Sequence, residues 1–167
     1  MNLPTSLRSF ARTLALTGLG LAALASPAQA QYREAITNDP ARCRGNGPAV
    51  SVTVTGIKSS TGRMRVQLYR GTKADWLQSG RWLYRIEVPA RAGAMSFCLP
   101  APSPGSYAVA VRHDVNGNGK TDLSKDGGGM SNNPSINLLN LGKPSYTKTA
   151  FAVGDGVKAI SIRMRYM

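Results

Sequence analysis

A short polar run from 113 to 122 holds the side chains best suited to chemistry. It reads His-Asp-Val-Asn-Gly-Asn-Gly-Lys-Thr-Asp, so oxygen-bearing side chains recur at Asp114, Asn116, Asn118 and Asp122. Oxygen ligands at alternate positions, with a glycine at the sixth, are typical of loops that wrap around Ca²⁺. The run therefore predicts a candidate cation site.

The correspondence with an EF-hand calcium loop is incomplete. Lys120 stands at the seventh position and would offer its backbone carbonyl, but Lys125 stands at the twelfth, where a bidentate Glu normally closes the shell. Asp126 lies one residue further on and could replace that Glu through a different bend. With so few carboxylates, we expect any bound Ca²⁺ to have a Kd of about 10⁻⁴–10⁻³ M, as in extracellular modules.

The same residues also describe a turn that closes without metal. Asn-Gly pairs adopt positive φ readily, and the side chain of Asp114 can accept hydrogen bonds from the backbone that follows it. Both interpretations stay open from sequence alone. His113, the only histidine, continues the core-facing phase of the preceding strand, so we expect it to support the loop.

The residues around this loop do not predict an enzyme. His113 and Asp114 are neighbours on a strand, where successive side chains point to opposite faces. No Ser or Cys stands in a nucleophile motif, and a lone histidine cannot form a His-rich metal site. We therefore expect a protein that binds or supports rather than catalyses.

The elements that position the loop are short strands. Alternation of apolar and polar residues predicts seven of them, joined by turns, with no long helical period, which is typical of a β-sandwich. The expected fold is all-β, a single seven-stranded antiparallel β-sandwich with one long loop over 114–146. Trp76 and Trp82 are expected to cover the core. The strands are expected at 50–56, 64–68, 83–88, 94–99, 107–111, 149–153 and 158–166.

The N-terminus has the pattern of an export signal. Residues 1–30 combine Arg8 and Arg12, an apolar stretch shorter than the ~20 residues of a membrane span, and an Ala-Gln-Ala cleavage site. The mature chain is expected to begin at Gln31, in the periplasm or outside the cell, with no membrane span. It is expected to comprise an extension, 31–48, and a β-sandwich domain, 49–167.

The two cysteines, Cys43 and Cys98, predict a disulfide, because an exported protein meets an oxidising compartment. Cys98 alternates out of phase with Phe97 and Leu99. The bond should therefore tie the extension across the outer face of a sheet.

The chain is strongly basic, with a formal net charge of +13. Such a balance favours anionic surroundings, and an anionic envelope polymer or a protein is a possible partner. The arginines are spread over separate segments, and no Lys/Arg run with interleaved aromatic residues is present, which argues against nucleic acid.

The 49–69 hairpin, the Gly-Ser-Tyr-Ala-Val-Ala-Val strand, the His113–Asp122 loop and the Ser-Asn-Asn of residues 131–133 together resemble one exported bacterial family. It is the family catalogued as domain of unknown function 2141, and the resemblance covers roughly residues 49 to 166. It implies an immunoglobulin- or prealbumin-like sandwich in the cell envelope. Asn132 and Asn133, like His113, are expected to support the loop. The resemblance implies no known activity, and the short 123–130 segment departs from the longer insert common in the family.

Three functions remain open. The first is a non-enzymatic envelope module that displays the 114–146 loop to a partner. The second is a weak Ca²⁺-binding protein, and the third binds an anionic polymer or nucleic acid through its basic faces.

Overall fold

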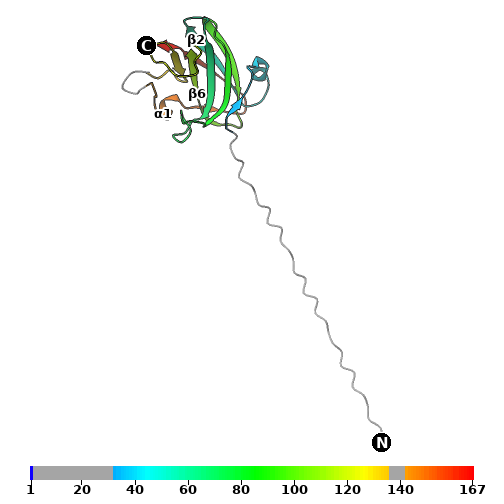
Figure 1. The fold of residues 1–167 in the computed structure, drawn as a ribbon. Coiled ribbons are helices and arrows are strands. Elements are labelled where there is room, and N and C mark those ends of the chain that lie inside the picture. Colours follow the sequence, from blue (N-terminus) through cyan, green and yellow to red (C-terminus); the bar gives the residue numbers. More distant parts are fainter. Residues whose placement is uncertain (2–31, 136–141) are drawn as a thin grey trace.

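The computed structural model describes Met1 and residues 32–135 and 142–167. The signal peptide expected at 1–30 therefore lies outside the described residues, apart from Met1. The described chain is all-β (Figure 1), as the sequence predicted. Its elements, in order, are β1 (Glu34–Ala35), the 3-10 helix η1 (Pro40–Arg44), β2 (Ala49–Ile57), β3 (Arg63–Arg70), β4 (Trp82–Pro89), β5 (Gly93–Pro100), β6 (Gly105–Asp114), β7 (Gly127–Met130), α1 (Tyr146–Thr149), β8 (Phe151–Val153), β9 (Val157–Arg163) and β10 (Arg165–Tyr166).

The strands form two mixed sheets. The large sheet has the order β1-β4-β3-β6-β7-β10, with β8 also paired to β6, and the small sheet has the order β5-β2-β9. Figure 1 shows the N-terminal elements in light blue and the C-terminal strand in red on opposite sides of the domain.

The strand count and directions differ from the predicted seven-stranded antiparallel arrangement. Pairs β1–β4 and β2–β9 are parallel. Strand β9 follows a crossover from the large sheet and returns beside β2 in the same direction, which a hairpin pattern in the sequence cannot reveal.

One apolar core joins the two sheets. The alternating side chains on each strand point to it, as expected for strands with one covered face. The small sheet contributes Val50, Val52, Val54, Phe97 and Leu99, and the large sheet contributes Met64, Val66, Leu68, Val109 and Val111.

Two segments contain regular structure that the sequence did not predict. The extension 31–48 holds β1 and η1, and Asp39 caps η1 by accepting a hydrogen bond from the Ala41 N–H at 3.0 Å. The long loop holds β7, which pairs with β6 and β10. Three of the four residues of β7 are glycines, so no apolar alternation marks it as a strand.

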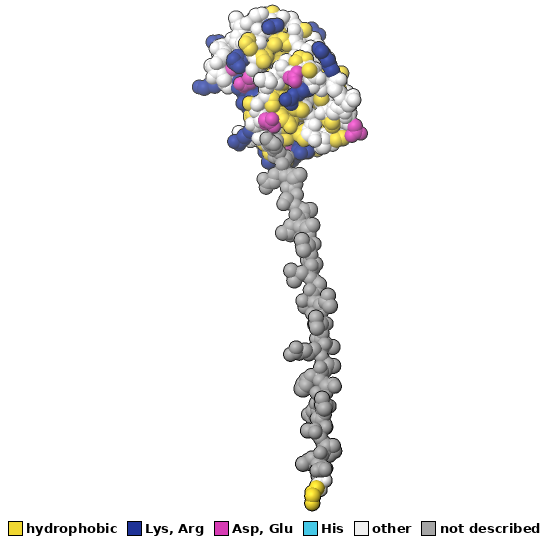
Figure 2. All heavy atoms as spheres, turned by 90° about the vertical axis from the view of Figure 1, so that its right-hand side faces the viewer, with side chains coloured by type: hydrophobic (Ala, Val, Ile, Leu, Met, Phe, Trp, Pro, Cys, Tyr) yellow, Lys and Arg dark blue, Asp and Glu magenta, His cyan; other side chains and the backbone are white. Residues whose placement is uncertain are grey.

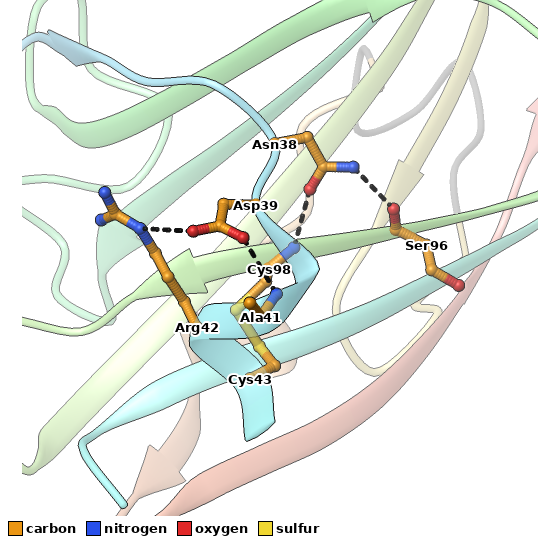
Figure 3. Close-up of a disulfide and its surroundings, with 7 residues drawn as sticks. All are labelled: Asn38, Asp39, Ala41, Arg42, Cys43, Ser96 and Cys98. Atoms are coloured by element: carbon orange, nitrogen blue, oxygen red, sulfur yellow. Dashed lines mark hydrogen bonds and ion pairs between the residues drawn. A yellow bond between two sulfur atoms is a disulfide. The ribbon is translucent and has the colours of Figure 1, made fainter. Parts of the chain in front are cut away.

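The predicted disulfide joins Cys43 of η1 to Cys98 of β5. Figure 3 shows Asn38 beside it, bridging to β5: its Oδ1 accepts from the Cys98 N–H at 3.1 Å, and its Nδ2 donates to the Ser96 carbonyl at 2.9 Å. Cys98 is buried while its neighbours Phe97 and Leu99 face the core. The extension is therefore fastened over the outer face of the small sheet, as expected.

A second, smaller apolar cluster lies apart from the main core. Trp76 and Trp82 are buried in it beside Tyr69, Ala108 and Met130. The Trp76 indole N–H donates to the Pro144 carbonyl at 2.8 Å. Both tryptophans are buried, but in this second cluster and not over the main core, where the sequence predicted them. No helix among the described residues is long and apolar enough to cross a membrane.

Candidate functional site

Three arginines that are far apart in sequence line up across the large sheet. Register pairs Arg65 of β3 with Arg112 of β6, Arg112 with Gly128 of β7, and Gly128 with Arg165 of β10. We call Arg65, Arg112 and Arg165 the arginine row. Glu87 of β4 ends it on the other side, where its carboxylate pairs with Arg65. The row faces away from the core, because Met64, Val66 and Val111 occupy the inward positions.

The neighbouring row across the same sheet is less polar. Gln67, Ala110 and Met130 are cross-strand partners there. Met130 belongs to the second apolar cluster, and Ala110 and Leu77 pack against that cluster. Successive residues on one face of a strand are about 7 Å apart, so a basic strip and an apolar strip lie side by side.

Both rows help to line a cavity of about 650 Å³. Its lining also includes Thr121, Leu123 and Asp126 from the long loop, and residues near the C-terminus. This volume falls within the range of small-molecule sites. The basic side chains that line it are Arg65, Arg112, Lys143, Arg163 and Arg165.

The three glycines of β7 differ in the space that surrounds a Cβ atom added to each of them. A Cβ on Gly127 would lie 2.5 Å from the Tyr166 ring, and one on Gly129 would lie 2.7 Å from Cγ2 of Ile162. A Cβ on Gly128 would meet no atom within 4 Å, and Gly128 has no positive φ. Packing therefore requires the two outer glycines and leaves the middle one open toward the arginine row.

Burial, and after it like charge, acts on the guanidinium groups of this region. Burial lowers the pKa of Arg112, and the nearby Arg65 guanidinium lowers it further. The pKa of Arg85, whose guanidinium stacks over the Trp82 ring at 4.1 Å, is lowered by burial and then by Arg65. Both side chains stay charged near neutral pH, so the face carries an excess of positive charge.

Arg112 also connects the cavity to the candidate cation loop. Its guanidinium donates to Thr121 Oγ1 at 3.0 Å, to the Gly119 carbonyl at 3.0 Å and to Asp114 Oδ2 at 3.3 Å. The first predicted cation ligand is therefore paired with an arginine of this chain. A guanidinium at this position repels a cation and lowers the affinity of the loop for Ca²⁺.

The loop closes largely through its own N–H groups. Asp114 Oδ2 accepts from the Gly119 N–H at 2.8 Å, Asn116 Oδ1 from the Asn118 N–H at 3.2 Å, and Asn118 Oδ1 from the Lys120 N–H at 2.7 Å. Asx turns of this kind need no metal.

The remaining carboxylates of the loop have partners as well. Asp122 Oδ2 accepts from the side-chain amides of Asn116 and Asn118, each at 2.8 Å, and these bonds lower the pKa of Asp122. Asp126 folds back as expected, but its two oxygens accept from the Val115 N–H at 3.1 Å and the Asp122 N–H at 2.9 Å.

One buried side-chain oxygen of the loop has no hydrogen-bond partner. Asp114 is 4% exposed, and its Oδ1 atom is buried and unpaired. Among the described residues, no three His, Cys, Asp or Glu side chains are grouped closely enough to hold a metal ion. The described residues thus offer one buried, unpaired oxygen, and a cation would depend on Asp122, the asparagine side chains and the Lys120 carbonyl for further ligands.

His113 supports the loop from the core side, where it is fully buried. Its Nε2 lies 2.7 Å from the Thr61 carbonyl, which can only accept, so Nε2 carries the proton. Nδ1 then accepts from the Tyr166 hydroxyl at 2.7 Å, and that oxygen accepts from the Lys58 N–H at 3.2 Å. Burial raises the pKa of Tyr166, which keeps its proton available for this bond. Both nitrogens of the imidazole are therefore engaged in structural contacts.

Asn132 and Asn133 bind the segment after β7 to Ala150 and to β9, and none of these hydrogen bonds reaches the 114–122 run. Both have positive φ, which asparagine tolerates. Asn132 donates to the Ala150 carbonyl at 2.9 Å, and Asn133 donates to Ser161 at 2.9 Å and accepts from the Arg163 N–H at 2.7 Å.

The sequence thus drew attention to the loop and not to the cavity beside it. The one available signal was the phase of Arg65, Arg112 and Arg165, each of which alternates with core residues.

The sequence model of one protein family matches residues 52–161, more than half of the chain. The family is described as "Uncharacterized protein conserved in bacteria (DUF2141)". No curated protein and no solved structure matches the chain.

Proposed function

The chain belongs to this family of uncharacterised bacterial proteins, and we propose that it is an exported, non-enzymatic binding module of the cell envelope. The single observation that carries the proposal is the cavity of about 650 Å³ on the outer face of the large sheet. The long loop 114–146 forms part of its wall through Thr121, Leu123 and Asp126. The proposed binding surface is therefore this cavity together with the part of the loop that lines it, whereas the sequence suggested the loop alone.

The surroundings of His113 support a non-catalytic role. A general base must reach its substrate by a hydrogen bond, directly or through one water. Here the ring is buried, and its two nitrogens are bonded to Tyr166 and Thr61. His113 instead stiffens the base of the loop.

A panel of small molecules tests the binding function. Anionic, neutral and cationic envelope components would be titrated into the oxidised protein while its melting temperature is followed. We expect at least one class to raise the melting temperature of the natural protein and not that of Gly128→Val, which places a side chain in the cavity. If no class separates the two proteins, the binding function is wrong.

Export is supported by the N-terminal signal pattern and by the disulfide. Expression of the full chain in a bacterial host, followed by fractionation and N-terminal sequencing, tests it. We expect a periplasmic or secreted product that begins at Gln31. A product that keeps Met1 and stays in the cytoplasm contradicts this.

Weak Ca²⁺ binding by the 114–122 loop is a second candidate function, and the buried, unpaired Asp114 Oδ1 favours it. With a Kd of about 1 mM, 5 mM Ca²⁺ would stabilise the fold by about 1 kcal/mol, or roughly 4 °C in melting temperature. The shift should be absent in Asp114→Asn. If Ca²⁺ does not change the melting temperature of the natural protein, the loop is a turn that closes without metal.

Binding of an anionic polymer through the basic faces has weaker support. On the one face drawn in Figure 2, Lys and Arg side chains are scattered among hydrophobic, uncharged and acidic atoms, so this face has no continuous basic track. A nucleic acid or a long polyanion is held by a continuous basic track.

A further inference from the structure

We propose that the cavity above Gly128 binds a small anionic amphiphile, with its acidic head on the arginine row and its apolar body against Met130 and Leu77. This inference rests on the proposed binding function and names the ligand class. Three independent features of the cavity carry it.

The first feature is the open position at Gly128. Among the described glycines within strands, Gly128 alone has neither a positive φ nor an atom within 4 Å of an added Cβ. Glycine weakens a strand, because it gives up side-chain packing and loses more entropy on folding. The fold gains nothing from glycine here, whereas a ligand gains direct access to the sheet between Arg112 and Arg165.

The second feature is the charge of the wall. Arg65 is paired with Glu87, and Arg112 with Asp114. Among the ion pairs of the described residues, none includes the side chain of Arg163 or Arg165. Asp126 is the one Asp or Glu side chain among the lining residues, and it is engaged by two backbone N–H groups. An anionic head would therefore meet unmatched positive charge, and guanidinium groups bind carboxylate and phosphate oxygens well.

The third feature is exposed apolar surface at the same place. Apart from Met1, the large hydrophobic side chains exposed among the described residues are Leu123, at 49%, and Met167, at 55%. Both line this cavity. Met130 and Leu77 continue the apolar surface toward the second cluster. A ligand with an apolar body would cover this surface and gain from its removal from water.

The placement of the two strips matches the two ends of such a ligand. The arginine row and the Gln67–Ala110–Met130 row are adjacent on one face, about 7 Å apart along the strands. A cavity of about 650 Å³ has the size of a site for one small molecule. Head and body would thus be bound at one site.

Calorimetric titration with ligands of matched tail tests the inference. Dodecanoate, dodecyl maltoside and dodecyltrimethylammonium share a tail and carry negative, neutral and positive heads, and acetate has the negative head alone. We expect dodecanoate to bind at one site, at least tenfold more tightly than the other two, and acetate to show no measurable binding.

Matched variants locate the site. Gly128→Val should weaken dodecanoate binding at least tenfold, whereas Gly154→Val should leave it unchanged, because Gly154 has equally open surroundings away from the cavity. Arg165→Gln should weaken dodecanoate binding about fivefold and leave dodecyl maltoside unaffected. Gly128→Ala, with a smaller side chain, repeats the test if Gly128→Val does not fold.

The outcomes separate this inference from the proposed function. If all three amphiphiles bind equally and Gly128→Val abolishes their binding, the cavity is a binding site but the preference for an anionic head is wrong. Dodecanoate binding that Gly128→Val does not alter would overturn the site. Binding of heparin but of none of the amphiphiles would overturn the inference in favour of a polymer.

Discussion

Alanine substitution at each glycine of β7 gives the sharpest prediction about stability. The three positions are consecutive in one strand, yet their surroundings differ. A Cβ at Gly127 or Gly129 would overlap Tyr166 or Ile162 at 2.5 and 2.7 Å, respectively, while a Cβ at Gly128 would meet nothing within 4 Å. Only the middle substitution should therefore be tolerated.

The magnitudes follow from two opposing effects. Replacing glycine where the backbone conformation suits alanine stabilises a protein by about 0.4–1 kcal/mol through the unfolded state. Forcing an extra methyl group into packed surroundings costs about 1–3 kcal/mol. We expect Gly128→Ala to raise the free energy of unfolding by up to about 1 kcal/mol. Gly127→Ala and Gly129→Ala should each lower it by about 1–2 kcal/mol, or roughly 4–8 °C in melting temperature.

Urea unfolding followed by tryptophan fluorescence measures these changes, because Trp76 and Trp82 are buried. Gly93→Ala is a useful control, since Gly93 has φ +92° but open surroundings and should report backbone strain alone. A loss of more than 1 kcal/mol in Gly128→Ala would refute the reasoning, because it would show that the fold itself requires this glycine.

Further predictions concern the rest of the fold. Replacing Cys43 and Cys98 by alanine should lower the free energy of unfolding by about 4 kcal/mol, given their separation of 55 residues, and an unchanged urea midpoint would contradict this. Burial raises the pKa of Tyr69. The buried, protonated Tyr69 hydroxyl should therefore contribute fully to the free energy of unfolding below about pH 10, the pKa of tyrosine in the unfolded chain. This contribution should be lost as the pH rises through the higher pKa of Tyr69 in the folded protein. Tyr69→Phe should lessen the fall in melting temperature above pH 10, and an identical fall would count against a buried phenol. Tyr166→Phe should leave Nδ1 of buried His113 without its hydrogen-bond donor and lower the free energy of unfolding in urea by about 1–3 kcal/mol. An unchanged free energy of unfolding would show that the Tyr166–His113 bond does not support the loop.

The strands of the main core could be predicted from sequence because each buries one face. Val50, Val52 and Val54 alternate with polar residues, and all three are fully buried. Strand β7 could not be predicted from sequence, because its glycines form no apolar pattern and because it exists only through pairing with β6 and β10. The parallel β2–β9 pair also depends on chain routing rather than on local pattern.

The candidate site divides in the same way. Local spacing identified the loop, and the disulfide followed from two cysteines and a signal sequence. The arginine row could not be predicted, because Arg65, Arg112 and Arg165 meet only through strand register. The pairing of Arg112 with Asp114, which disfavours a cation, is also invisible in the spacing of the loop.

The most direct test of the central claim is an amide NMR map of the oxidised protein titrated with dodecanoate. We predict saturable shifts at Gly127–Met130, at Arg112 and at Arg165, with none at Gly154. Shifts spread evenly over the surface, or confined to other elements, would contradict a ligand site above Gly128.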